Sequence, residues 1–294
     1  MSSPYDATFS SSISVTTSPT APKKFDLRRL YTAAVLIPMV YAIIVLLQAW
    51  ALTLLLIGVG SIALQELYRI SFQTRTNHPL VAVGLVAFAC ILAHTHVGLT
   101  LSTVLIASVI GLLIAMLFIP GTRAQRGTDT FTAFLGLLYV GVTLSTVVSV
   151  RALPAGEWLA LFLAVVTWAS DSGAYYAGTL WGKHLLVPSI SPKKTVEGVF
   201  GGLLLAITTA LLAQVWFAPI LSLMDALFLG ALITVSGLFG DLFESVIKRR
   251  QGVKDSGGIL PGHGGMLDRL DSLLFTAPTF YYYVIWVRGL TPPL

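Results

Sequence analysis

The sequence predicts an all-α, polytopic integral membrane protein, and three observations lead to this fold class. Only 11% of the 294 residues are charged, whereas about a quarter are charged in a soluble globular domain. Strongly hydrophobic residues make up 55% of the chain. Long apolar stretches recur along it, each of about 20 residues, which is the length of helix that crosses a ~30 Å hydrocarbon core. The single cysteine, Cys90, cannot form an internal disulfide.

Nine apolar stretches are predicted to be membrane-spanning helices, and the short connections between them leave no room for a soluble catalytic domain. Gln48 and the polar residues 94–96 separate the first four only weakly, so a count of eight or ten is the alternative. The nine stretches are residues 30–48, 50–69, 79–97, 99–119, 130–152, 157–180, 197–217, 225–247 and 270–288.

The chain is divided by composition into a tail and two sets of helices. Residues 1–29 are predicted to be a disordered cytoplasmic tail, because residues 1–22 are rich in Ser and Thr and have no apolar periodicity. A transit peptide is less favoured, since the segment contains Asp6 and has no arginine before Arg28. Residues 30–152 are expected to form amino-terminal membrane helices, and residues 153–294 the catalytic helices with their cytoplasmic loops.

The basic residues predict the orientation, because loops rich in Lys and Arg stay cytoplasmic. With nine spans and a cytoplasmic amino terminus, sixteen of the 18 Lys and Arg residues lie inside, and only Arg151 and Arg288 lie outside. Two cytoplasmic loops are longer than the others, residues 181–196 and 248–269. We therefore expect the functional site at the cytoplasmic side.

The end of the eighth span carries polar residues on one helical face. Asp241, Glu244, Ser245 and Lys248 are spaced at i, i+3, i+4 and i+7. Carboxylates near the end of a membrane helix are unfavourable unless a cation or a metal ion compensates them. The alternative is a solvated helix end with a simple Glu244–Lys248 ion pair.

The following loop has features of an anion-binding segment. Five glycines lie within residues 257–265, and glycine lets backbone N–H groups approach and surround a phosphate. The alternative is a merely flexible loop. Just before the ninth span, Asp268 and Asp271 are spaced to share one helical face, with Arg269 between them.

Other candidate residues lie near the same side. Asp171 is on a polar face of the sixth span. Residues 191–198 read as a helix start with Ser191 as N-cap, so that Lys193 and Lys194 would lie beside exposed backbone amides that attract anions. These lysines could instead serve only to fix the topology. Glu66, near the end of the second span, is either a helix-packing group or a site residue.

Together these residues resemble a known family. The stretch Ser245–Asp271 begins with Ser-Val-Ile-Lys-Arg and, after four residues, continues with Lys-Asp-Ser-Gly. After Gly258 and Ile259 it ends with Leu-Pro-Gly-His-Gly-Gly-Met-Leu-Asp-Arg-Leu-Asp. It resembles the signature of phosphatidate cytidylyltransferases, also called CDP-diacylglycerol synthases. Residues 171–178, 191–198 and 240–245 also resemble that family's motifs, although Val196 stands where a tryptophan is expected. The amino-terminal half matches only as generic membrane helices.

The resemblance implies transfer of CMP from CTP to phosphatidic acid, giving CDP-diacylglycerol and pyrophosphate, and a requirement for Mg2+, with two metal ions expected. It implies metal ligation by Asp241 and Asp268, and catalytic roles for these two residues together with Asp171, Lys248 and Arg249. The substrate-binding residues that we expect are Ser191, Lys193, Lys194, Glu197, Glu244, Ser245, Lys254, Asp255, His263, Gly264, Gly265, Arg269 and Asp271. The expected location is the inner, cytoplasmic membrane. CTP, phosphatidic acid and the bilayer are the expected partners, a homodimer is compatible with the sequence, and nucleic acid is not expected.

The chemistry suits the residue types, and two alternatives remain. A phosphate monoester is largely a dianion at neutral pH, so it is already a nucleophile and needs metal ions and fixed cations rather than a strong base. Within the enzyme class, the acceptor could be another phosphorylated lipid such as an isoprenoid ether lipid. From a different class, a secondary transporter could use Asp171, Asp241 and Glu244 as ion-coupling sites, although the chain has no evident repeat and its charges gather at one side.

Overall fold

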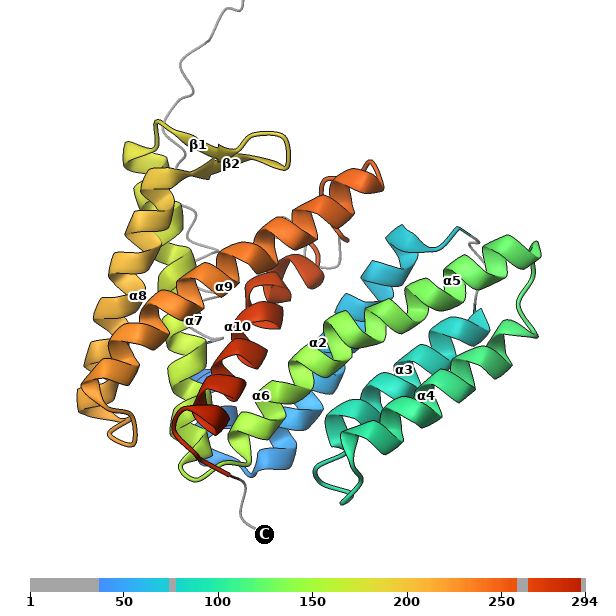
Figure 1. Ribbon diagram of the computed structural model, residues 1–294, viewed down its shortest axis with the longest axis horizontal. Helices are drawn as coiled ribbons and strands as arrows, with labels where there is room; N and C mark the ends of the chain where they lie inside the picture. Colours follow the sequence, from blue (N-terminus) through green and yellow to red (C-terminus); the bar gives the residue numbers. More distant parts are fainter. Residues whose placement is uncertain (1–36, 74–77, 258–263, 292–294) are drawn as a thin grey trace, which may run out of the picture. The chain divides into compact units, whose positions relative to one another are not determined.

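A computed structural model describes residues 37–73, 78–257 and 264–291, and in these ranges the chain is mostly helical. The chain divides into two units, residues 1–40 and residues 41–294. The predicted tail, residues 1–29, lies outside the described residues. The helices and strands below belong to the second unit, whose arrangement is drawn in Figure 1.

The described elements follow the predicted stretches closely. Each of the nine stretches contains helix within its described part, the first from residue 37 onward. Residues Arg123–Arg151 form one continuous helix, which is made of α5, a π-helical turn η2 and α6. The elements are η1 (Ala42–Leu46), α2 (Ala49–Ser71), α3 (His78–Ala93), α4 (Leu101–Met116), α5 (Arg123–Gly136), η2 (Leu137–Val142), α6 (Thr143–Arg151), α7 (Gly156–Trp181), β1 (Leu185–Val187), β2 (Ser191–Thr195), α8 (Val196–Trp216), α9 (Leu223–Arg250) and α10 (Leu267–Trp286).

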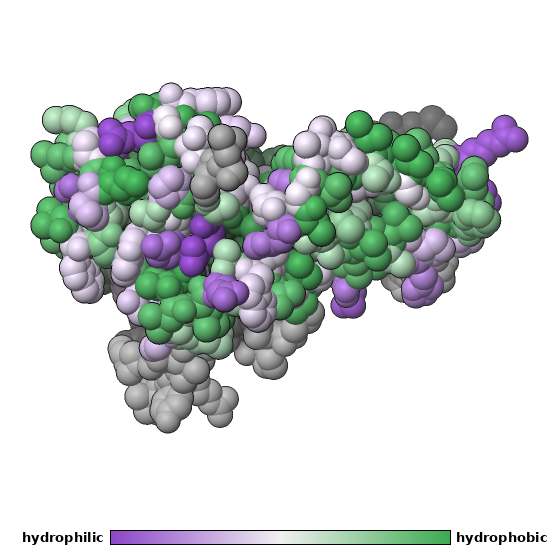
Figure 2. Space-filling model, turned by 90° about the horizontal axis from the view of Figure 1, so that it is seen from below, coloured by the Kyte–Doolittle hydropathy of each residue, from purple (hydrophilic) through white to green (hydrophobic). Residues whose placement is uncertain are grey.

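Four of the described helices are long and apolar enough to cross a membrane: α2, the continuous helix Arg123–Arg151, α8 and α9. Helices α3 and α4 are apolar but have only 16 residues each. Helices α7 and α10 are long enough, with 26 and 20 residues, but they also carry the polar residues of the site described below. Large apolar side chains such as Leu204, Val215 and Trp216 are exposed, and hydrophobic residues cover wide areas of the surface in Figure 2. The chain is a multi-pass membrane protein.

The carboxy-terminal helices pack through small residues. Helix α7 packs most extensively against α8, and α9 packs against both α8 and α10. A Cβ atom on Gly173 would come within 2.5 Å of the carbonyl oxygen of Gly201, and one on Gly201 would overlap the Cβ of Ala177. Small residues of this kind let membrane helices approach closely. The close α7–α8 contact fixes the strand β2, just before α8, beside the end of α7.

The structure corrects the predicted helix start at Ser191. Residues Ser191–Thr195 form strand β2, which pairs antiparallel with β1, and α8 begins only at Val196. Thr195 takes the N-cap position, where its side-chain oxygen accepts a hydrogen bond from the N–H of Gly198 at 3.1 Å. Pairing with β1 therefore determines the local structure here, despite the capping pattern at Ser191. Lys193 and Lys194 lie on a strand and not beside the free backbone N–H groups of a helix start.

We predict that Gly201→Ala destabilises the protein by about 1 to 3 kcal/mol, because the added methyl group overpacks the α7–α8 contact. Gly58→Ala is the matched control, since a Cβ at this position on α2 meets no atom within 4 Å. Denaturant unfolding of both variants in detergent checks the prediction. Equal midpoints for the two variants would contradict it.

Candidate functional site

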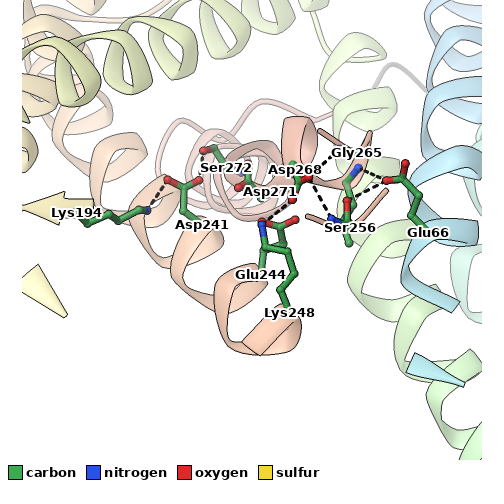
Figure 3. Close-up of polar contacts among 11 residues, drawn as sticks. Glu66, Lys194, Asp241, Glu244, Lys248, Ser256, Gly265, Asp268, Asp271 and Ser272 are labelled. Carbon is green, nitrogen blue, oxygen red and sulfur yellow. Dashed lines mark hydrogen bonds and ion pairs between the residues drawn. The ribbon is translucent and has the colours of Figure 1, made fainter. Parts of the chain in front are cut away.

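The candidate site lies along the last turns of α9, where they meet the first turns of α10, strand β2 and the loop that precedes α10 (Figure 3), and α7 adds Asp171. Its first part is centred on Asp241 of α9. The Lys194 ammonium donates to Asp241 Oδ2 at 2.5 Å, and the Ser272 hydroxyl donates to Asp241 Oδ1 at 2.7 Å. The same hydroxyl oxygen lies 3.2 Å from Asp171 Oδ1. One hydroxyl proton therefore serves two carboxyl groups, which come from α7 and α9.

Asp271 joins the two parts of the site. It precedes Ser272 on α10, and its carboxyl group lies within hydrogen-bonding reach of Asp241 and electrostatically close to Glu244. In Figure 3 its side chain lies between those of Asp241 and Asp268. Helices α9 and α10 thus carry a row of carboxyl groups along their contact.

The second part is an ion-pair network around Lys248. Its ammonium group lies 2.6 Å from Glu244 Oε2 and 2.6 Å from Asp268 Oδ1. The Glu244 side chain is 2% exposed and that of Lys248 13%. The alternative of a solvated Glu244–Lys248 pair is thereby excluded, because the pair exists but is buried and shared with Asp268.

Asp268 is held from several sides. Its Oδ2 accepts hydrogen bonds from the N–H groups of Gly265 at 2.8 Å and Ser256 at 3.3 Å. Burial raises the pKa of the Asp268 carboxyl group, but hydrogen bonds with Glu244, Lys248 and the Gly265 N–H outweigh burial and lower the pKa to about 2. Asp268 is therefore ionised at neutral pH.

The remaining expected residues lie around this centre in different ways. Arg249, Lys193, Lys254, Asp255 and Arg269 are exposed. Ser191 and Ser245 are half-buried, and Gly264 lies beside Gly265 with the positive φ of 78° that favours glycine. Glu197 accepts hydrogen bonds from the backbone N–H groups of Lys183 and His184 and contacts the His184 ring at 2.6 Å. His263 lies outside the described residues.

Three residues of the site were not expected from the sequence. Ser272 bridges two carboxyl groups, and Ser256 contacts Asp268. Tyr139, on η2, has a buried hydroxyl group with no partner among the described residues, and the charges of Asp271, Glu244 and Asp241 act on it. Ser272 directly follows Asp271 of the signature, and this position could have identified it as a site residue. Nothing in the sequence distinguishes Tyr139 from the nine other tyrosines.

Comparison with known proteins shows the family of this chain. The model of the cytidylyltransferase family matches residues 27–287. This chain belongs to the cytidylyltransferase family. It is similar to the phosphatidate cytidylyltransferase of Bacillus subtilis (strain 168), at 36% identity over 266 residues that cover 87% of this chain and 97% of the relative.

Two further relatives of this cytidylyltransferase match different shares of the chain. The phosphatidate cytidylyltransferase of Staphylococcus haemolyticus (strain JCSC1435) is 33% identical over 83% of this chain and 94% of its own length. The uncharacterized protein YnbB of Escherichia coli (strain K12) is 46% identical, but over only 44% of this chain and 43% of its own length. The likeness to the two named enzymes thus extends into the amino-terminal half.

The donor set of this family member suits a hard divalent cation. Asp171, Asp241, Asp271, Glu244 and Asp268 offer only oxygen atoms, which Mg2+ prefers. The buried Oε1 of Glu244 has no hydrogen-bond partner among the described residues. Among the described residues no three His, Cys, Asp or Glu side chains form a ready metal centre, and Asp241 and Asp268 hold different lysines.

We predict that Lys248→Met destabilises the protein by about 3 to 5 kcal/mol, because it leaves Glu244 and Asp268 buried without their shared cation. Arg249→Met is the matched control. It removes an exposed positive charge from the next position of α9, so its effect should stay within about 0.5 kcal/mol. Thermal and denaturant unfolding in detergent measure the difference, and an undisturbed Lys248→Met protein would show that the network contributes nothing to stability.

Proposed function

We propose that this chain is a phosphatidate cytidylyltransferase, which transfers CMP from CTP to phosphatidic acid and releases pyrophosphate. The observation that carries the proposal is the gathering of the family signature around one charged centre, with Lys248 held between Glu244 and Asp268. The family match over residues 27–287 and the names of the relatives support the choice of substrates.

The reaction is the displacement of one phosphate group by another. An oxygen of the phosphatidate phosphate forms a bond to the α-phosphorus of CTP, while the bond from that phosphorus to the β-phosphate oxygen breaks. A phosphate monoester with a second pKa near 6 is largely a dianion at neutral pH. The acceptor is therefore a nucleophile without a strong general base, and what opposes the reaction is repulsion between two polyanions.

The cationic side chains reduce this repulsion. Lys194 and Lys248 are held at defined positions by Asp241, Glu244 and Asp268, so their ammonium groups are oriented before a substrate binds. Lys193, Arg249 and Arg269 are exposed, and we expect their positive charges to attract the phosphates of the substrates. Ser272 keeps Asp171 and Asp241 together through its hydroxyl group.

Mg2+ is part of the proposal, with Asp241 and Asp268 as its ligands and Asp271 between them. When bound, the ion would supply positive charge that stabilises the phosphate oxygens during transfer. The same two carboxylates form ion pairs with Lys194 and Lys248. The presence of a second metal ion, and of a homodimer, stays a prediction.

The proposal also includes the finer membrane topology. The sequence supports nine spans in the inner membrane with a cytoplasmic amino terminus, because the positively charged residues then gather on one side. That arrangement gives the site access to CTP from the cytoplasm and to phosphatidic acid from the bilayer.

The experiment that tests the function is incubation of purified protein in detergent with labelled CTP, Mg2+ and phosphatidic acid, followed by lipid extraction. Label in CDP-diacylglycerol supports the proposal. A parallel reaction with a phosphorylated isoprenoid ether lipid tests the alternative acceptor. Label only in the CDP-activated form of that lipid would show that it, and not phosphatidic acid, is the substrate. No labelled lipid with either acceptor would contradict the enzyme assignment.

We predict that Asp241→Asn and Asp268→Asn each lose most activity and that the double variant is little worse than either one. Residues that hold one ion act as a unit, so their losses do not multiply. Asp255→Asn is the control, because Asp255 is exposed and should have a milder effect. The measurement is the Mg2+ dependence of CMP transfer in all four variants, and multiplied losses would disprove the shared metal site.

For the topology, we predict that cysteines at Lys193 and Asp255 react only from the cytoplasmic side, and a cysteine at Thr291 only from outside. All three positions are exposed, and Cys90→Ala provides a background without cysteine. Labelling of intact cells and inverted vesicles with an impermeant maleimide measures the side. If Lys193→Cys and Asp255→Cys were labelled from opposite sides, a single site containing both loops would be excluded.

A further inference from the structure

Glu66 of α2 reaches from the amino-terminal half of the chain into the segment around α10 (Figure 3). The residue is 2% exposed. Its Oε2 accepts a hydrogen bond from the backbone N–H of Leu267 at 2.9 Å and another from the Ser256 hydroxyl at 3.1 Å. The contact joins residues that are 190 and 201 positions apart in the sequence.

The two bonds of Glu66 are directed at groups that need an acceptor. Leu267 is the first residue of α10, and the N–H groups in the first turn of a helix have no partner within the helix. A negative charge at that end is also favourable for the helix dipole. Ser256 and Leu267 are themselves fully buried, so water does not offer an alternative acceptor there.

Two glycines of the signature leave room for this carboxylate. A Cβ atom on Gly257 would overlap Glu66 Oε1, and one on Gly265 would lie 2.6 Å from Glu66 Oε2. The lack of a side chain at Gly257 thus lets Glu66 approach closely, and at Gly265 it leaves room for both Glu66 and the Ser256 hydroxyl oxygen, which a Cβ there would overlap. This close packing is separate from the phosphate cradle that the glycine-rich sequence predicts.

Glu66 is connected to the charged centre through Ser256. The Ser256 hydroxyl donates to Glu66, and its backbone N–H donates to Asp268 Oδ2. Gly265 lies against Glu66 on one side and donates its N–H to Asp268 on the other. Ser256 is therefore bonded to both Glu66 and Asp268, and Gly265, which donates to Asp268, is packed against Glu66.

We propose that Glu66 is a positioning residue for the transfer reaction, which fastens Ser256 and the start of α10 so that Asp268 and Lys248 keep their geometry. The inference rests on the proposed function for its activity measurement. It concerns a residue outside the signature, and it gives the amino-terminal helices a part in the site. Glu66 acts as a hydrogen-bond acceptor, so a neutral acceptor of the same shape should replace it.

The experiment compares Glu66→Leu, which keeps the volume and removes the acceptor, with Glu66→Gln, which keeps an acceptor oxygen. We expect Glu66→Leu to lower kcat per mole of folded protein by about 10- to 100-fold, since small displacements of catalytic groups have effects of this order. Glu66→Gln should stay within about three-fold of the unaltered protein. Hydrogen exchange of the peptide covering residues 264–267 should become faster in Glu66→Leu and remain slow in Glu66→Gln.

Thr53→Val is the matched control on the same helix. Thr53 is buried and contacts the His96 ring at 2.8 Å, so its loss perturbs α2 without touching the site, and kcat should not change. If Glu66→Leu does not fold, Ser256→Ala takes its place, because it removes one of the two hydrogen bonds and leaves Glu66 intact. Ser256→Ala should also lower kcat and accelerate exchange at residues 264–267.

The outcomes separate this inference from the proposed function. If the unaltered protein forms no CDP-diacylglycerol, the proposed function fails, while the exchange measurement still tests the contact. If the unaltered protein is active but Glu66→Leu keeps its kcat after correction for the folded fraction, Glu66 is only a packing residue. Equal losses in Glu66→Gln and Glu66→Leu would also overturn the proposal, because an acceptor would then not suffice.

Discussion

The ammonium group of Lys248, placed between Glu244 and Asp268, is the interaction on which the site depends. Two carboxyl groups on neighbouring helices repel each other, and burial strengthens that repulsion because water no longer screens it. A lysine on α9 that reaches both removes the conflict and attaches the start of α10 to the end of α9. Lys194 does the same for Asp241 from the hairpin. The site is therefore assembled by cations that belong to the chain.

The packing of the helices brings these charged residues together. Small residues at Gly173 and Gly201 bring α7 and α8 close together, and the strand that precedes α8 then carries Lys194 to Asp241. On the other side, Glu66 of α2 fastens the segment before α10. Elements from both halves of the chain thus fix a centre whose signature residues all lie in the second half.

Much of the candidate site could be predicted, because local rules govern it. The helical spacing of Asp241, Glu244 and Lys248 places them on one face, and the structure confirms that they lie in a single charged centre. Asp271 likewise joins this centre, as its spacing from Asp268 indicated. The helix start at Ser191 was predicted wrongly, since capping signals are short-range and β1 offers backbone partners that no local pattern reveals. The position of Ser272 beside Asp271 hinted that it belongs to the site, but its contacts with Asp171 and Asp241 depend on how α7 and α9 pack against α10.

The sequence by itself determined that the chain is a helical membrane protein, because the length of its hydrophobic stretches acts along the chain. The cytidylyltransferase family was indicated separately, by the resemblance of residues 245–271 to a known signature. The tertiary structure decided which charges meet. Lys248 could have paired with Glu244 alone, one turn away on the same helix, and only the packing of α10 against α9 adds Asp268. Glu66 was equally compatible with packing and with function until α2 was placed beside the segment that precedes α10. Contacts between residues about 200 positions apart depend on the packing of whole helices, and no local pattern specifies that packing.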